Sequence, residues 1–280
     1  MERKKITISD LSRIKSEGGR IAMLTAYDFS TALVLESAGI DIILVGDSLG
    51  NVILGYDSTV PVTMEEMIHH AKAVRRGTRY AFLVADMPFM SFNIDKAQTI
   101  TNAGRLVKEA GADAVKIEGG NETISAMIKA VVDAGIPVMG HIGLTPQTAT
   151  MLGGYKVQGN NAAAAKELMR QAAVLEKAGC FSIVLECIPD VLAELISKKM
   201  KIPVIGIGAG VRCDGQVLVT HDMLGLYERL SPKFVKRYAH LAKEMSEAVA
   251  NYIQEVKDAK FPLPQHSYTM KKEELEKLGL

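Results

Sequence analysis

The stretch AGADAVKIEGG, residues 110–120, contains the unit that decides the fold. Its first two residues end a predicted helix, because glycine readily adopts the left-handed conformation that stops one. The run AVKI that follows is apolar apart from Lys116, as expected of a strand buried on both faces. The strand then ends on an acid, Glu118. The same Ala-Gly helix end precedes an apolar run at residues 38–39, 134–135 and 178–179.

Strands and helices of this kind alternate along the chain. Amphipathic patterns predict helices over residues 64–76, 95–110 and 162–178, and a weaker eighth strand follows at 217–220. Parallel strands need helical crossovers, so eight units favour a (β/α)₈ barrel, with an open doubly wound sheet as the alternative. The clear strands are expected at residues 21–25, 42–46, 82–85, 114–117, 137–140, 183–185 and 203–207.

The length of 280 residues suits one barrel domain over residues 1–280. No linker or low-complexity tract divides the chain. A short N-terminal segment, residues 1–20, is expected to form a helix that covers the barrel bottom. A C-terminal tail, residues 262–280, is Pro-rich and then charged, which predicts an extended piece followed by a terminal helix.

Composition excludes several functional classes. The net charge is +1, from 33 basic and 32 acidic residues, so nothing favours a nucleic-acid or membrane-surface partner. Three cysteines without a C-x-x-C pair indicate reduced thiols of a cytoplasmic protein and neither a disulfide framework nor a zinc site. We expect no secretory signal and no transmembrane helix, because no apolar run is long enough.

Four apolar runs end on a carboxylate, at Asp47, Asp86, Glu118 and Glu186. The C-terminal ends of parallel strands lie on one face, so these acids are expected to converge there. Clustered carboxylates repel one another, and a divalent cation relieves that repulsion; ligands that are all oxygen favour Mg²⁺ over zinc. The alternative for each acid alone is a helix cap or an ion pair with a lysine.

Three further features lie near these strand ends. Strand periodicity puts Lys116 on the same face as Glu118, where it either binds an anion or carbonyl of a substrate or simply pairs with the acid. His141 is expected after the fifth strand, as a structural histidine or as a substrate-proximal hydrogen-bonding residue. The run GIGAG, residues 206–210, lacks the last glycine of a dinucleotide fingerprint because Val211 stands there; it indicates a phosphate-binding turn or close backbone packing.

Longer motifs give the chain a family resemblance. Together they resemble ketopantoate hydroxymethyltransferase, in order, from about Thr25 to about Ser267; the tail beyond Tyr268 is not part of the pattern. The motifs are TAYD (25–28), VGDSLG (45–50), PVT (61–63), KIEGG (116–120), GHIGLTPQ (140–147), GGYKVQG (153–159), LEC-x-P (185–189), PVIGIGAG (203–210) and DGQ (214–216).

The resemblance implies a (β/α)₈ TIM barrel of the phosphoenolpyruvate/pyruvate superfamily type. It implies transfer of a hydroxymethyl group from 5,10-methylenetetrahydrofolate, the co-substrate, to 3-methyl-2-oxobutanoate, which gives 2-dehydropantoate in the first step of pantothenate biosynthesis. It further implies a Mg²⁺-dependent cytoplasmic enzyme that forms a homo-oligomer, a homodecamer in most members.

Residue roles follow from the same motifs. The resemblance implies Asp47 and Asp86 as metal ligands and Glu118 as a third, acting through water. It implies contacts between the keto acid and Asp47, Ser48, Asp86 and Lys116. Mg²⁺ bound to a 2-oxo acid would act as a Lewis acid and stabilise the enolate formed when the C3 proton leaves.

The resemblance implies Glu186 as the catalytic base. It stands on a different strand from the metal ligands, which leaves it free for proton transfer. The folate is expected against the loop over residues 144–159. The rival interpretation is a Mg²⁺-dependent C–C lyase or phosphonate mutase of the same superfamily acting on a 2-oxo acid. Such an enzyme should carry a nucleophilic or general-acid cysteine on a loop near the site. Here Cys187 directly follows Glu186, and strand alternation points it away. A non-catalytic barrel is a second rival, which loss of one of the acids would have favoured.

Overall fold

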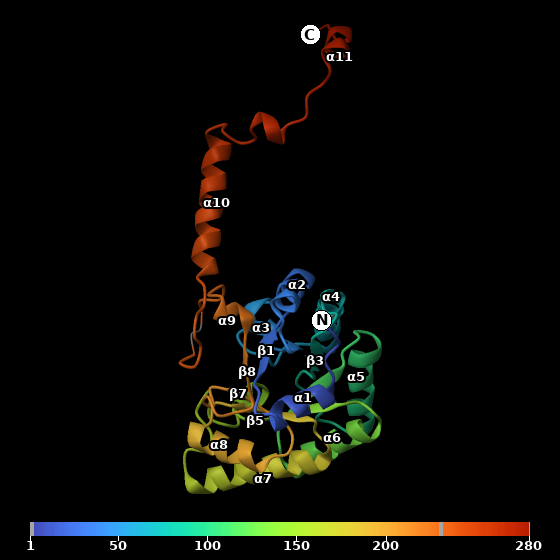
Figure 1. Ribbon diagram of the computed structural model, residues 1–280, viewed down its shortest axis with the longest axis vertical. Coiled ribbons are helices and arrows are strands. Elements are labelled where there is room, and N and C mark those ends of the chain that lie inside the picture. The colour runs from blue at the N-terminus through green and yellow to red at the C-terminus, as the bar shows by residue number, and fades with distance from the viewer. Residues whose placement is uncertain (1–2, 230–231, 280) are drawn as a thin grey trace.

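Eight parallel strands pair in sequence order, and the last pairs back with the first to close a barrel. The structure is a computed structural model that describes residues 3–229 and 232–279 (Figure 1). The (β/α)₈ barrel is therefore confirmed and the open sheet is excluded. The strands are β1 (Ile21–Thr25), β2 (Ile42–Val45), β3 (Phe82–Asp86), β4 (Ala114–Glu118), β5 (Val138–Gly143), β6 (Ser182–Glu186), β7 (Val204–Ile207) and β8 (Gly215–Leu218).

Helices connect the strands and surround the barrel. Thr63 begins α4 with the expected capping box to Glu66, and Gly39 and Gly179 end α2 and α7 in the left-handed conformation. The helices are α1 (Ile8–Ser16), α2 (Phe29–Ala38), α3 (Leu49–Val52), α4 (Met64–Gly77), α5 (Lys96–Lys108), α6 (Glu122–Asp133), α7 (Ala162–Ala178), α8 (Asp190–Lys199), α9 (Thr220–Met223), α10 (Leu241–Lys257) and α11 (Lys272–Lys277), with short 3₁₀ helices η1 (Pro146–Thr148) and η2 (Pro264–His266).

Strand alternation divides the core into two clusters. Residues such as Val115 and Ile117 point outward and pack with the helices, whereas Phe82 and Val84 belong to the cluster inside the barrel. Helix α1 covers the N-terminal ends of the strands, and Leu11 on this helix is fully buried in the interior cluster. The expected N-terminal helix therefore plugs the barrel bottom, leaving the opposite end for a site.

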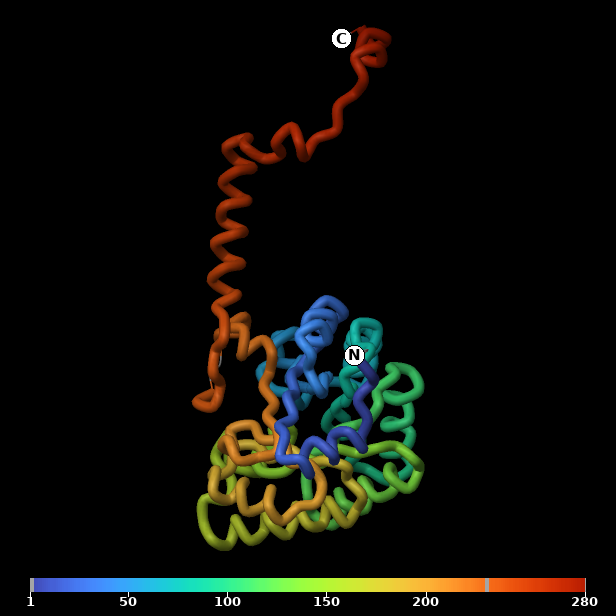
Figure 2. Tube along the Cα trace, in the orientation of Figure 1, coloured from blue at the N-terminus to red at the C-terminus, as the bar shows by residue number. Residues whose placement is uncertain are grey.

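The structure differs from the sequence prediction in three elements. Strand β5 continues through His141 to Gly143, so this histidine lies within the strand and not after it. Strand β8 begins two residues earlier than expected, at Gly215. Helix α10 was not predicted; it projects away from the barrel and has no buried residue (Figures 1 and 2).

Candidate active site

Strand register brings the predicted acids together at the C-terminal end of the barrel. Asp86 lies opposite Lys116, and Glu118 lies opposite His141. Glu186 pairs with Gly143 at the end of β5. Lys116 and Glu118 alternate with the outward-facing Val115 and Ile117, so both side chains point into the barrel. The convergence expected from the sequence is therefore observed.

Asp47 follows β2 and is 4% exposed. Its backbone N–H donates to Asp86 Oδ2 at 3.0 Å, and the Gln147 side-chain amide donates to its Oδ2 at 2.8 Å. Burial raises the pKa of Asp47 well above its usual range, and the charges of Asp86 and Glu118 raise it further. Negative charge therefore dominates around Asp47 at this end of the barrel.

Lys116 is the principal cation of the cluster. Its Nζ lies 2.9 Å from Asp86 Oδ1, and both side chains are buried. Burial alone would lower the pKa of Lys116, but the nearby charges of Asp86, Glu118 and Asp47 raise it above its ordinary value. For Asp86 burial has the opposite effect and raises the pKa, although Lys116 opposes this shift. The lysine therefore stays charged at neutral pH.

His141 lies between two of the acids. Its Nδ1 is 3.3 Å from Glu118 Oε1, and its Nε2 is 3.2 Å from Glu186 Oε2, a contact that is not aligned for a hydrogen bond. Nδ1 is also 3.3 Å from Lys116 Nζ, and one ring nitrogen cannot serve both neighbours. Burial and Lys116 would lower the pKa of His141, yet Glu118 and Glu186 raise it to about 9. We therefore assign the Nδ1 proton to the contact with Glu118.

Gln147 is the residue of this cluster to which sequence reasoning gave no role. It sits on η1, where Pro146 starts the turn, and it is 4% exposed. Its Nε2 donates to Asp47 Oδ2 and to the Met87 carbonyl at 2.9 Å, and its backbone N–H donates to Glu118 Oε2 at 3.1 Å. This last bond, with His141, lowers the pKa of Glu118 despite burial.

Ser48 and two glycines complete the local geometry. The Ser48 hydroxyl lies 2.7 Å from the Tyr27 hydroxyl, which is deeply buried. A side chain at Gly46 would lie 2.8 Å from Ser48 Oγ. Gly143 has a φ of 98°, and a Cβ there would lie 2.2 Å from the Glu186 carbonyl oxygen. Only glycine lets β5 pass this close to the strand that bears Glu186.

A magnesium ion fits the donor set at Asp47 and Asp86. Among residues 3–229 and 232–279, no three His, Cys, Asp or Glu side chains are grouped closely enough to hold a metal together. Mg²⁺ commonly takes only one or two carboxylates and completes its shell with water and substrate oxygens. Two adjacent buried carboxylates, whose pKa values are both raised by burial, meet that need.

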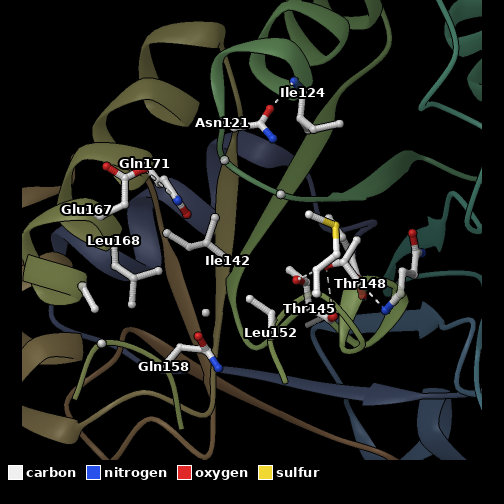
Figure 3. A pocket seen from close by; sticks show the side chains of 18 of the residues that line it. Asn121, Ile124, Ile142, Thr145, Thr148, Leu152, Gln158, Glu167, Leu168 and Gln171 are labelled. Carbon is white, nitrogen blue, oxygen red and sulfur yellow. Dashed lines mark hydrogen bonds between the residues drawn. The ribbon is translucent and has the colours of Figure 1, made fainter. Parts of the chain in front are cut away.

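A cavity of about 450 Å³ adjoins this cluster (Figure 3). It lies between α6, α7 and the loop over residues 144–159, and both Glu118 and Gln147 belong to its wall. Ile142, Leu152 and Leu168 lie around its middle, with Gln171 and Gln158 on opposite sides. The cavity therefore opens beside the acids.

A closed parallel barrel whose mouth holds buried acids and a lysine defines an enzyme of the (β/α)₈ class. The ketopantoate hydroxymethyltransferase family model matches residues 5–264, so the chain belongs to that family. It is 57% identical to 3-methyl-2-oxobutanoate hydroxymethyltransferase of Carboxydothermus hydrogenoformans over 98% of this chain and 99% of that protein. The Enterococcus faecalis protein of the same name is 54% identical over 99% of this chain and 100% of its own length. The family resemblance and the enzyme prediction are thus confirmed.

Solved structures agree on the fold. Phosphonopyruvate hydrolase, solved in complex with oxalate and Mg²⁺, matches with a TM-score of 0.60 and 14% identity over 98% of this chain and 95% of that one. The 2,3-dimethylmalate lyase, a PEP mutase/isocitrate lyase superfamily member, matches with a TM-score of 0.59 and 15% identity over 93% of both chains. These likenesses show the same barrel fold. Within the described part of the chain, no helix has the length and apolar character to span a bilayer.

Proposed function

We propose that the protein transfers a hydroxymethyl group from 5,10-methylenetetrahydrofolate to 3-methyl-2-oxobutanoate, which gives 2-dehydropantoate and tetrahydrofolate in the first step of pantothenate biosynthesis. The observation that carries this proposal is the convergence of Asp47, Asp86, Lys116 and Glu186 at one barrel mouth in a chain of this family. The proposed place of action is the cytoplasm.

The metal side of the proposed site consists of Asp47 and Asp86, with Glu118 acting through water. Mg²⁺ bound there would supply Lewis-acid stabilisation of the negative charge that develops on the keto acid. Gln147 and the Asp47 backbone N–H fix the orientations of the two aspartates, which pre-organises them.

Lys116 and Ser48 are the proposed substrate contacts. Lys116 keeps its positive charge inside the barrel, where it would stabilise the oxyanion that develops at the keto oxygen. The Ser48 hydroxyl is oriented by Tyr27 and donates to the substrate carboxylate in this proposal. Both contacts bind and orient the acid before a proton is removed.

Glu186 is the proposed base. It is the most exposed of the four acids, with 15% of its side chain accessible, and it lies away from the Asp47–Asp86 pair on β6. It would remove the C3 proton to give the enolate. The enolate carbon would then form a bond to the methylene carbon of the folate, and water would supply the hydroxyl oxygen on that carbon. Both C–N bonds that held the methylene carbon break, and the two folate nitrogens take up the proton from Glu186 and the remaining proton of the water.

The rival lyase or mutase needs a reactive cysteine, which Cys187 fits poorly. Burial and the charge of Glu186 raise the pKa of the Cys187 thiol to about 11, so it stays protonated at neutral pH. Its sulfur lies near Gly208 on the neighbouring loop. The hydroxymethyltransferase is therefore the better-supported reaction.

The direct test is an assay of 2-dehydropantoate formation from the keto acid and methylenetetrahydrofolate, with and without EDTA. We expect product that requires the folate, disappears with EDTA and returns with added Mg²⁺. Folate-independent cleavage of a 2-oxo acid, with no transfer, would instead favour the lyase.

A further inference from the structure

We propose that the cavity between α6, α7 and the loop over residues 144–159 holds the reduced pterin of the one-carbon donor, whose pyrimidine ring is flat and aromatic. This inference rests on the proposed function, because it assigns a place to the co-substrate of that reaction. The volume of about 450 Å³ falls within the range of roughly 300–1,000 Å³ that is usual for small-molecule sites.

The cavity wall suits a flat ring. Phe92, Ile124, Ile142 and Leu168 line it and are all buried, so they are held in place by the core around them. Fixed apolar side chains make favourable contacts with both faces of an aromatic ring at little cost in side-chain entropy. The wall is thus pre-formed and not assembled around a ligand.

The polar groups of the wall suit the edge of a pterin. Asn121, Gln158 and Gln171 line the cavity. Asn121 Oδ1 accepts from the Ile124 N–H, Gln158 Nε2 donates to the Lys156 carbonyl and Gln171 Nε2 donates to Glu167. A side-chain amide has two N–H donors and an oxygen with two lone pairs, so each keeps hydrogen-bonding capacity for a ligand. A pterin edge alternates N–H donors with a carbonyl and ring nitrogens in the same way. None of the described lining residues is Lys or Arg, so a phosphate or carboxylate would find no cation there. The anionic tail of the donor therefore stays outside the cavity.

Gln147 provides an independent indication of a bound molecule. Its amide nitrogen faces two acceptors, Asp47 Oδ2 and the Met87 carbonyl, which fixes the amide orientation. Its Oε1 is consequently buried with no partner among the described residues. An unpaired buried carbonyl is costly, so an N–H or O–H of a bound molecule would stabilise this oxygen. Because Gln147 and Glu118 belong to both the cavity wall and the acid cluster, a ring placed here lies beside the keto acid.

A matched pair of substitutions on α7 tests the assignment. Ala164 lines the cavity, whereas the preceding Ala163 is exposed and does not. We expect Ala164→Phe to fill part of the cavity and raise the KM for methylenetetrahydrofolate at least about tenfold, while Ala163→Phe leaves it within about twofold. Exchange of the C3 proton of the keto acid in D₂O, measured without folate, should stay near the wild-type rate in both variants.

A second variant removes only the polar edge. Gln171→Leu keeps the side-chain volume, and loss of its hydrogen bonds to the ring should raise the donor KM by about tenfold with proton exchange unchanged. If Ala164→Phe and Gln171→Leu both fold and show the wild-type donor KM, or if both lose proton exchange, the cavity assignment is wrong. A wild-type protein that exchanges the proton but transfers nothing from folate would instead contradict the proposed function itself.

Discussion

Asp47 and Glu118 are both buried carboxylates at the barrel mouth, but their neighbours differ. Glu118 has His141 and the Gln147 backbone N–H, which lower its pKa. The charged neighbours of Asp47 are mainly carboxylates. Burial raises the pKa of Asp47, and the charges of these carboxylates raise it further. In the metal-free protein Asp47 is thus the acid most ready to hold a proton, and a cation must displace that proton to bind.

Mg²⁺ affinity should therefore depend on pH. A carboxyl with a raised pKa is protonated below that pKa, so affinity should fall as pH is lowered and reach a plateau once the carboxyl is ionised. Isothermal titration in two buffers of different ionisation enthalpy counts the protons released. Release of protons that declines with rising pH is expected. Affinity that is independent of pH, with no proton release, would argue against Asp47 as a ligand.

A substitution at Asp86 tests the proposed metal site in a second way. Asp86→Asn keeps the shape but removes the charge, so we expect Mg²⁺ to bind at least about tenfold more weakly. Asp133→Asn is the control, because Asp133 is exposed on α6 and pairs only with Lys129. Titration with Mg²⁺ measures both variants. Equal affinity in Asp86→Asn and wild type would remove Asp86 from the metal site.

The site residues at strand ends were predictable, because the position of a residue along a strand determines where its side chain points. The ends of parallel strands share one face, and a period of two residues assigns Lys116 and Glu118 to the interior. Gln147 was not predictable in this way, because it lies on a 3₁₀ turn whose path depends on tertiary contacts. His141 was predicted to follow the fifth strand but lies within it, because the glycines on either side obscure the continuation of β5.

At the level of elements, α1 closes the barrel bottom. Leu11 is fully buried in the interior cluster, while Lys15 beside it pairs with Asp214 at 2.6 Å. We expect Leu11→Ala to lower the free energy of unfolding by about 2–5 kcal/mol, the usual cost of such a cavity. Leu33→Ala, at a site that is 45% exposed, should change it by less than about 1 kcal/mol.

Urea unfolding followed by far-UV circular dichroism measures both leucine variants. Equal stability of Leu11→Ala and wild type would mean that α1 is not part of the barrel core. Activity per folded molecule should be unchanged in Leu11→Ala, because the plug lies at the opposite end from the acids.

The strands were easier to predict than the last helices for a physical reason. Strands of a closed barrel are buried on both faces, so they appear as continuous apolar runs. Strand β8 has an exposed Gln216 in its centre, and its predicted start was two residues late. Helix α10 has no buried residue, so its sequence contains no core positions from which to predict it.

At the scale of the whole molecule, α10 carries an exposed apolar face. Met245, Val249, Tyr252, Ile253 and Val256 are each at least 45% exposed, and they recur at helical spacing. Such a face on a helix that projects from the barrel supports the proposed homo-oligomer. The family resemblance implies that this oligomer is a decamer.

Disrupting this face should change the assembly. Native mass spectrometry should give ten copies of the 30.3 kDa chain for the wild type and smaller species for Val249→Asp. Ser246→Asp adds the same charge elsewhere on α10 and should leave the assembly intact. Identical masses for Val249→Asp and wild type would show that this face does not join subunits.

In the proposed site Glu186 moves the proton while Asp47 and Asp86 hold the metal. Deuterium exchange at C3 of 3-methyl-2-oxobutanoate, followed by NMR in D₂O with Mg²⁺ and without folate, tests this division of roles. For Glu186→Gln we expect exchange at least about 100-fold slower, with Mg²⁺ and keto-acid affinities within about twofold of wild type. Exchange at the wild-type rate in this variant would contradict it.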